Sequence, residues 1–107
     1  MDIIYEDKGI EELITEGKSK RYKKVSRTKE LLDGLLAVHR IMESVPDTSF
    51  LQQFSRLHYE RLRHQYSGKS SVRLANGYVE RLIFREQHGG IVVELIEIDD
   101  THYGNKK

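Results

Sequence analysis

Apolar residues recur at every second position on both sides of an Asn-Gly pair at positions 76 and 77. This period of two is typical of half-buried strands, and Asn-Gly readily supplies the positive φ angles of a two-residue turn. Residues 70–84 are therefore predicted to form a β-hairpin. The alternating residues are Val72 and Leu74 on the first arm, with Leu82 and Phe84 on one side of the second arm and Val79, Arg81 and Ile83 on the other.

Apolar residues three to four positions apart predict two helices earlier in the chain. The first covers residues 7–17, where a glycine suited to a left-handed C-terminal cap ends it. The second is long, ends before Pro46 and has Ser19 or Ser26 as its expected N-cap. Gly34 inside this helix costs about 1 kcal/mol relative to alanine, which indicates a place of close packing.

Shorter patterns complete the predicted order of elements. Residues 3–5 and 91–98 are apolar runs that predict a first strand and an interior strand. Residues 47–54 predict a capped turn of helix, residues 57–68 a loop or short edge strand, and residues 88–90 a turn. The predicted class is α+β: a small twisted antiparallel sheet, made of the N-terminal strand and a C-terminal meander, with two N-terminal helices packed on one face.

Composition narrows the class of protein. A chain of 107 residues is expected to form a single domain, residues 1–107. It has no cysteine, which excludes disulfides and thiolate metal sites. No apolar run approaches the ~20 residues that span a bilayer, and the acidic start is unlike a signal peptide. We therefore expect a cytoplasmic protein without a membrane partner.

The net charge of +1 hides a strong segregation of charge along the chain. Residues 18–29 hold seven Lys or Arg residues and no acid, and residues 56–85 hold seven against two acids. Residues 1–17 and 86–105 are acidic. The two basic blocks favour nucleic acid or an acidic partner, although solvated surface explains the first block equally well.

Standard catalytic motifs are missing from the sequence. It holds no Gly-rich phosphate loop, no H-E-x-x-H and no G-x-S-x-G. His58 and His64 are six residues apart, a spacing that does not place them on one helical face as a pair of metal ligands. We expect neither a metal nor a cofactor.

The candidate chemistry lies in two arginines placed almost symmetrically about the Asn-Gly pair. Arg73 and Arg81 interrupt apolar strands, and the predicted hairpin lets them face each other. Like charges repel, so a bridging phosphate would explain the pair. Alternatively, Glu80 or Glu94 forms a salt bridge with either arginine. The other polar candidates in the C-terminal half are His58, Arg61, Arg63, Lys69, His102 and Tyr103.

Two guanidinium groups, an imidazole and a phenol suit metal-independent RNA cleavage. The arginines would hold the scissile phosphate, and a histidine or tyrosine would move protons between the 2′-hydroxyl and the leaving oxygen. A tyrosine has a pKa of about 10, so roughly one in a thousand is ionised at pH 7. His102 is therefore favoured as the acid or base, with Tyr103 stacking on a base or positioning the phosphate.

These motifs resemble those of RelE/HigB-type toxins of bacterial type II toxin–antitoxin systems, in the RelE/ParE superfamily. The resemblance rests on S-V-R-L-x-N-G, followed by R-L-I-F, an apolar strand and a terminal D-x-H-Y-G. It covers residues 57–105 and includes the block L-H-Y-E-R-L before the sheet. The N-terminal strand and helices agree with the family in order and length, but less specifically.

The resemblance implies a microbial-ribonuclease-like RelE fold and a ribosome-dependent endoribonuclease. Such an enzyme cuts mRNA in the decoding site by 2′-hydroxyl attack without a metal and so inhibits translation. Its partners would be the ribosome, mRNA and a cognate antitoxin of helix-turn-helix type, and operator DNA would be bound only through the toxin–antitoxin complex. The implied catalytic residues are Arg73, Arg81, His102, Tyr103 and His58, and the candidates to replace the family's RNA-binding lysines are Arg61, Arg63 and Lys69.

Two other functions stay open from the sequence. Toxins of the related ParE type share the fold but bind DNA gyrase, and they generally lack the phosphate-binding and proton-transfer residues found here. A plain nucleic-acid-binding module would use the two basic blocks as its footprint and would cleave nothing. The acidic segments at both ends favour contact with an antitoxin over a purely basic binder.

Overall fold

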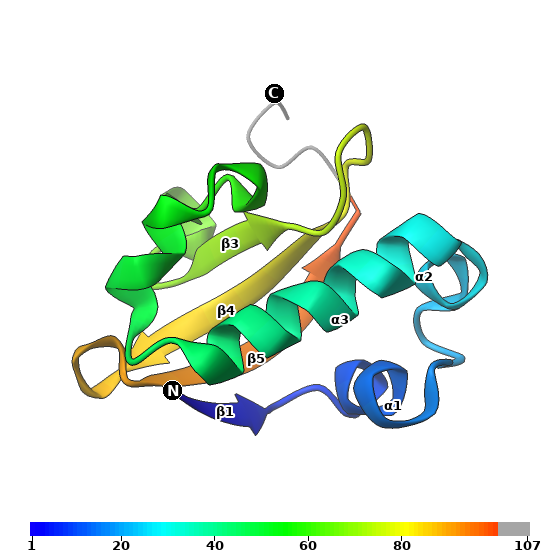
Figure 1. Ribbon diagram of the computed structural model, residues 1–107, viewed down its shortest axis with the longest axis horizontal. Helices are drawn as coiled ribbons and strands as arrows, with labels where there is room; N and C mark the ends of the chain where they lie inside the picture. Colours follow the sequence, from blue (N-terminus) through cyan, green and yellow to red (C-terminus); the bar gives the residue numbers. More distant parts are fainter. Residues whose placement is uncertain (101–107) are drawn as a thin grey trace.

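A five-stranded β-sheet with helices against one face organises the chain (Figure 1). The computed structural model describes residues 1–100, apart from the side chain of Gln65. Within this range the strand order is β1-β5-β4-β3-β2, and all neighbours are antiparallel except β1 and β5, which run parallel. The strands are β1 (Asp2–Tyr5), β2 (Glu60–Arg61), β3 (Ser70–Arg73), β4 (Arg81–Gln87) and β5 (Val92–Asp99).

The fold is therefore α+β, and its sheet is mixed. The prediction of an antiparallel sheet is wrong at the β1 edge, where β1 runs parallel to β5. A parallel pair needs a long connection between its strands, and here residues 6–91 separate β1 from β5. The pattern of apolar residues predicts both strands, but it carries no local signal for their relative direction.

Three α-helices lie within the described residues, one more than the sequence predicts: α1 (Lys8–Glu16), α2 (Lys23–Arg27) and α3 (Lys29–Ser44). For α1, the Asp7 side chain accepts a hydrogen bond from the Gly9 N–H at 2.7 Å, and Gly17 ends the helix with a φ of 80°, as predicted. Thr28 separates α2 from α3 because its backbone is extended, with φ −108° and ψ 107°. Among residues 1–100, no helix is both long enough and apolar enough to cross a membrane.

Neither Ser19 nor Ser26 caps a helix, contrary to the expectation. Tyr22 precedes α2 and Thr28 precedes α3, and neither side chain makes a capping hydrogen bond. Ser26 Oγ instead accepts a hydrogen bond from the Ser19 N–H at 2.8 Å and donates one to the Tyr22 carbonyl at 2.9 Å. The two serines therefore fasten the loop before α2 onto that helix.

Short 3-10 helices fill several connections of the described chain: η1 (Thr48–Gln53), η2 (Ser55–Leu57), η3 (His64–Tyr66) and η4 (His88–Gly90). η1 is the predicted capped turn, because the Asp47 side chain accepts a hydrogen bond from the Ser49 N–H at 2.8 Å. β2 is the short edge strand expected in residues 57–68, and η4 is the turn expected at residues 88–90.

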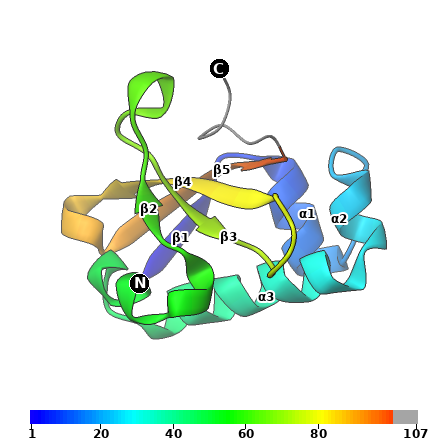
Figure 2. The same cartoon turned by 90° about the horizontal axis from the view of Figure 1, so that it is seen from above.

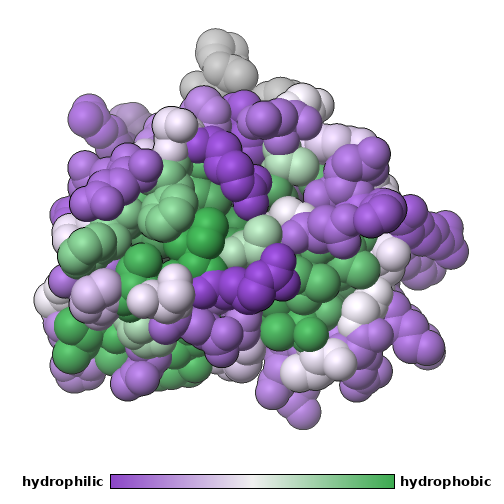
Figure 3. All heavy atoms as spheres, in the orientation of Figure 1, coloured by the Kyte–Doolittle hydropathy of each residue, from purple (hydrophilic) through white to green (hydrophobic). Residues whose placement is uncertain are grey.

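One apolar core fills the space between the three helices and one face of the sheet. Gly34 shows how closely these layers approach, since a Cβ atom there would stand 1.9 Å from the carbonyl oxygen of Leu74. α3 therefore packs directly on the chain that leaves β3. On the outer side, hydrophilic side chains cover much of the face that carries α3 (Figure 3). The core residues from the strands and the hairpin are Val72, Leu74, Leu82, Phe84, Val93, Leu95 and Ile98.

The predicted hairpin forms, but its turn is wider than two residues. β3 ends at Arg73, and β4 begins at Arg81. Inside the connection the Tyr78 N–H donates a hydrogen bond to the Ala75 carbonyl at 3.3 Å. Of the Asn-Gly pair only Gly77 has a positive φ, 83°, whereas a two-residue type I′ turn needs positive φ at both positions. The pair therefore makes a turn within a longer loop over residues 74–80.

A β-bulge in β5 changes which residues face the core. Strict alternation from Leu95, which packs in the core, would place Asp99 in the core as well. The pairing of β4 with β5 instead shifts at this point and leaves Ile96 as an extra residue. Ile98 therefore lies in the core, and Asp99 lies opposite Arg81 on the other face of the sheet.

Candidate functional site

The face of the sheet opposite the helices carries the two arginines. Arg73 and Arg81 are direct partners in the β3–β4 ladder, and such partners point to the same face. The adjacent pair, Val72 and Leu82, belongs to the core, so the arginines point away from it. Figure 2 shows the sheet with α3 along one side and the chain around β2 rising on the other. The hairpin thus brings the two arginines together, as the sequence predicts.

Contacts from β2, from β3 and from the residue after η2 hold Arg81 in place, and 15% of its side chain is exposed. Its Nη1 donates hydrogen bonds to Ser71 Oγ at 3.1 Å and to the His58 carbonyl at 3.4 Å. Its Nη2 lies 3.9 Å from Glu60 Oε1. The guanidinium group is therefore oriented before any ligand arrives, which lowers the entropic cost of binding one.

The acids around the pair are not those that the sequence suggests. Glu80 is buried and pairs with Lys24 at 2.9 Å, and Glu94 pairs with Arg85 at 2.7 Å. Asp99 is the acid placed opposite the second arginine in the ladder, and it is 8% exposed. The sequence does not reveal this role, because only the bulge in β5 turns Asp99 to this face.

Arg73 is half-buried, and its Nε atom has no hydrogen-bond partner among residues 1–100. A buried donor without a partner costs about 1–3 kcal/mol. An anion bound between the two guanidinium groups would screen the repulsion between the like charges. The arrangement is therefore suited to binding a phosphate group.

His58 reaches the arginine pair through its backbone. It follows η2 in the left-handed conformation, with φ 49°, and its carbonyl accepts the hydrogen bond from Arg81. Its side chain is exposed and lines a cavity of 480 Å³ together with Phe54. A role for its imidazole in proton transfer stays a prediction. His102 and Tyr103, the other predicted proton carriers, lie outside the described residues.

Two of the three predicted RNA-binding cations line a different site. The Arg61 Nη2 atom lies 3.8 Å from Glu86 Oε1, on the helical side of the sheet. Lys69 lines the same site, and its Nζ lies 5.9 Å from the centre of the Tyr66 ring. Arg63 is exposed at the residue before η3. Arg61 is thus separated from the arginine pair by the sheet itself.

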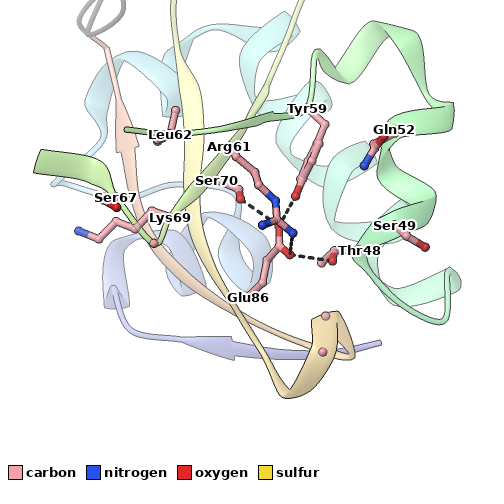
Figure 4. A pocket seen from close by; sticks show the side chains of 13 residues that line it. Thr48, Ser49, Gln52, Tyr59, Arg61, Leu62, Ser67, Lys69, Ser70 and Glu86 are labelled. Atoms are coloured by element: carbon pink, nitrogen blue, oxygen red, sulfur yellow. Dashed lines mark hydrogen bonds and ion pairs between the residues drawn. The ribbon is translucent and has the colours of Figure 1, made fainter. Parts of the chain in front are cut away.

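This second site is built around the carboxylate of Glu86, which the sequence motifs do not single out (Figure 4). Thr48 Oγ1 donates a hydrogen bond to Oε1 at 2.9 Å, Ser70 Oγ donates one to Oε2 at 2.9 Å, and the Tyr59 hydroxyl also donates to Oε2. Burial and the hydrogen bond to this carboxylate raise the pKa of Tyr59, so its phenol stays a neutral donor. The signal that could have revealed the site is an acid two residues after Phe84, at an inward position of β4.

Comparison with known proteins identifies no family for this chain. No protein-family model matches it, and no curated protein matches it at a significant level. What the protein does must therefore be inferred from its residues and their arrangement.

Proposed function

We propose that the protein is a RelE/HigB-type toxin with a RelE-like fold: a cytoplasmic endoribonuclease that cuts mRNA on the ribosome and so inhibits translation. The observation that carries the proposal is the placement of Arg73 directly opposite Arg81, on the sheet face away from the helices. The motifs S-V-R and R-L-I-F thereby lie on paired strands, β3 and β4. The α+β architecture is compatible with the proposal.

In the proposed reaction, the 2′-hydroxyl of the RNA attacks the adjacent phosphate. The two guanidinium groups hold this phosphate and stabilise the charge that its oxygens gain in the transition state. A bond forms between the 2′ oxygen and phosphorus, the bond from phosphorus to the 5′ oxygen of the next nucleotide breaks, and a 2′,3′-cyclic phosphate results. One group accepts the 2′ proton and another protonates the leaving oxygen. The candidates are His102, which the reference pKa favours, Tyr103 and His58.

The proposed partners follow from the same assignment. The substrate is mRNA in the ribosomal decoding site, and a cognate antitoxin of helix-turn-helix type would mask the arginine pair. Operator DNA would be bound only by the toxin–antitoxin complex. Positively charged side chains supply the stabilisation of the phosphate, so the mechanism includes no metal or cofactor.

Substitution of Arg81 tests the proposal most directly. We expect Arg81→Ala to lower mRNA cleavage on purified ribosomes by about 100- to 1,000-fold, the usual loss when one group that stabilises an oxyanion is removed. Arg85→Ala is the matched control, because Arg85 lies on the same strand and face but is paired with Glu94 at 2.7 Å. The control variant should cleave within a few-fold of the unmodified protein.

Two outcomes would contradict the proposal. Full cleavage by Arg81→Ala would remove the assigned role of this residue. Intact mRNA together with gyrase-dependent DNA breaks, after expression of the unmodified protein in cells, would indicate a ParE-like toxin instead.

The exposed basic segment at residues 18–29 favours one second candidate, a non-catalytic nucleic-acid-binding module. Lys18, Lys20, Lys23 and Arg27 are exposed there. Such a module would bind RNA with a steep dependence on salt, with a slope of about −0.7 for each phosphate contacted on single strands. Such a module would leave ribosome-bound mRNA intact, and this outcome separates the binding module from the endoribonuclease.

A further inference from the structure

A cleft on the helical side of the sheet surrounds Glu86 (Figure 4). Its volume of 610 Å³ falls within the range of about 300–1,000 Å³ that is typical of small-molecule sites. Elements distant in the sequence line it, namely η1, β2, the start of β3, the end of β4 and η4. Its principal polar side chains are Thr48, Tyr59, Arg61, Lys69, Ser70 and Glu86.

Glu86 has capacity for one further hydrogen bond from the cleft. An ionised carboxylate accepts about four hydrogen bonds, and three hydroxyl groups of the surrounding chain supply three of them. Two of these bonds fall on Oε2 and one falls on Oε1. Arg61 approaches Oε1 to 3.8 Å, which is an ion-pair distance but is longer than a hydrogen bond. A ligand that donates a hydroxyl proton to Oε1 would therefore complete the coordination of the carboxylate.

Two cations line the same cleft. The side chain of Arg61 is 79% exposed, and Lys69 is half-buried. Guanidinium and ammonium groups both bind phosphate. A ligand that offers a hydroxyl donor to a carboxylate and a phosphate to two cations has the chemistry of a ribonucleotide, because the 2′-hydroxyl is the donor that DNA lacks.

The cleft continues around the edge strand β2 towards the arginine pair. A neighbouring cavity of 480 Å³ shares Tyr59 and Arg61 with it. His58, whose carbonyl contacts Arg81, also lines this cavity. Phe54, which is 36% exposed, lies there too, and exposed aromatic rings in such grooves stack on unpaired bases. A single RNA strand could therefore reach from one site to the other.

We propose that the Glu86 cleft binds a ribonucleotide that flanks the cleavage site of the same RNA strand. Glu86 accepts a hydrogen bond from the 2′-hydroxyl, and Arg61 and Lys69 contact the phosphate. The path of the strand to the arginine pair rests on the proposed function, whereas binding in the cleft is measurable without cleavage.

The test compares a single-stranded octamer of uridine with its 2′-deoxy counterpart, using fluorescence anisotropy and the full-length protein. The unmodified protein should bind the RNA about tenfold more tightly, as expected for one hydrogen bond to a charged group. Glu86→Gln should bring this ratio close to one. Arg61→Ala should weaken the binding of both oligonucleotides and should lower the salt slope by about 0.7. Arg40→Ala removes an exposed arginine of α3 and should change neither the two affinities nor the salt slope.

Several outcomes would overturn the proposal. Equal affinity of the unmodified protein for the two oligonucleotides would do so, as would a preference for RNA that survives in folded Glu86→Gln. If Glu86→Gln does not fold, Arg61→Ala tests the proposal instead. An unchanged RNA affinity and salt slope in Arg61→Ala would exclude binding of RNA in the cleft. Ribosomal cleavage is measured in parallel: a preference for RNA without cleavage overturns the proposed function alone, and cleavage without the preference overturns the cleft alone.

Discussion

Two polar clusters lie on opposite faces of the same strands, and their charges are reversed. On the face away from the helices, a central arginine, Arg81, contacts a serine of β3 and a glutamate of β2. On the helical face, a central glutamate, Glu86, contacts the neighbouring serine of β3 and the neighbouring arginine of β2. The four supporting residues are Glu60 and Arg61 in β2 and Ser70 and Ser71 in β3.

One short edge of the sheet supports two polar clusters. Neighbouring residues of a strand point to opposite faces, so one pair from β2 and one pair from β3 are enough for both clusters. A shift of the register by one residue would exchange the two sets and would bring like charges together. The clusters differ in the kind of group they bind. Three hydroxyl groups donate to Glu86, so the Glu86 cluster is suited to a hydroxyl donor. The arginine cluster carries two like charges, and Arg73 keeps a buried Nε atom without a partner within residues 1–100, so this cluster is suited to an anion.

The largest effect on stability is expected from Gly34→Ala, which should disturb the arginine cluster before the Glu86 cluster. The new Cβ would stand 1.9 Å from the Leu74 carbonyl oxygen, and backbone cannot move aside as a flexible side chain does. We expect a loss of about 3 kcal/mol in the free energy of unfolding, measured by urea denaturation. Leu74 directly follows Arg73, so cleavage should fall as well.

The neighbouring substitution Asp33→Ala provides the control. It removes only an exposed ion pair with Lys29 in the same helix, and such pairs contribute little. Equal stability of Gly34→Ala and Asp33→Ala would show that α3 does not hold the hairpin as described.

Tyr59→Phe removes one of the three hydroxyl groups from the Glu86 cluster and leaves the arginine pair untouched. The phenol hydrogen bonds to a carboxylate in a partly buried site, so the free energy of unfolding should fall by about 1–2 kcal/mol. Chemical denaturation measures the change. If Tyr59→Phe were as stable as the unmodified protein, Glu86 would not depend on the Tyr59 hydroxyl as a donor.

Ser71→Ala makes the corresponding deletion beside Arg81, because it removes the hydroxyl that accepts a hydrogen bond from the guanidinium group. It should lower the cleavage of ribosome-bound mRNA by several-fold.

The smallest effect concerns the dependence of stability on pH. The pKa of Tyr59 is raised in the folded state above about 10, its unfolded value, so the folded state holds this proton more tightly. This contribution to stability is fully present below about pH 10 and is lost as the pH rises through the folded pKa. The free energy of unfolding, measured from about pH 9 to pH 11, should therefore fall less steeply with pH in Tyr59→Phe than in the unmodified protein.

Other tyrosines set the background for this measurement. Burial also raises the pKa values of Tyr5 and Tyr22, and hydrogen bonds to Glu80 and Asp33 raise those of Lys24 and Lys29, so these groups contribute to the decline that the variant retains. Identical pH profiles for Tyr59→Phe and the unmodified protein would rule out Tyr59 as a contributor.

Local patterns in the sequence were sufficient for the elements that carry their own boundary signals. Asp7 and Gly17 mark both ends of α1, and Asp47 marks the start of η1. The period of two in the hairpin was sufficient to place the two arginines on neighbouring strands and away from the core, but a two-residue turn would have paired Arg73 with Glu80. The wider loop over residues 74–80 sets Arg73 opposite Arg81. These predictions succeed because caps and strand alternation act between residues close in sequence.

Within residues 1–100, tertiary contacts decided the features that no local pattern encodes. The direction of β1 depends on β5, far along the chain, and the bulge at Ile96 depends on the pairing of β5 with β4. That bulge turns Asp99 towards Arg81, and the hydroxyl groups that collect around Glu86 come from three separate segments. The sequence by its alternation determined which strands present arginines. The packing of distant segments decided which acid accompanies them and where a second polar site forms, because a carboxylate remains buried only where other parts of the chain bring donors to it.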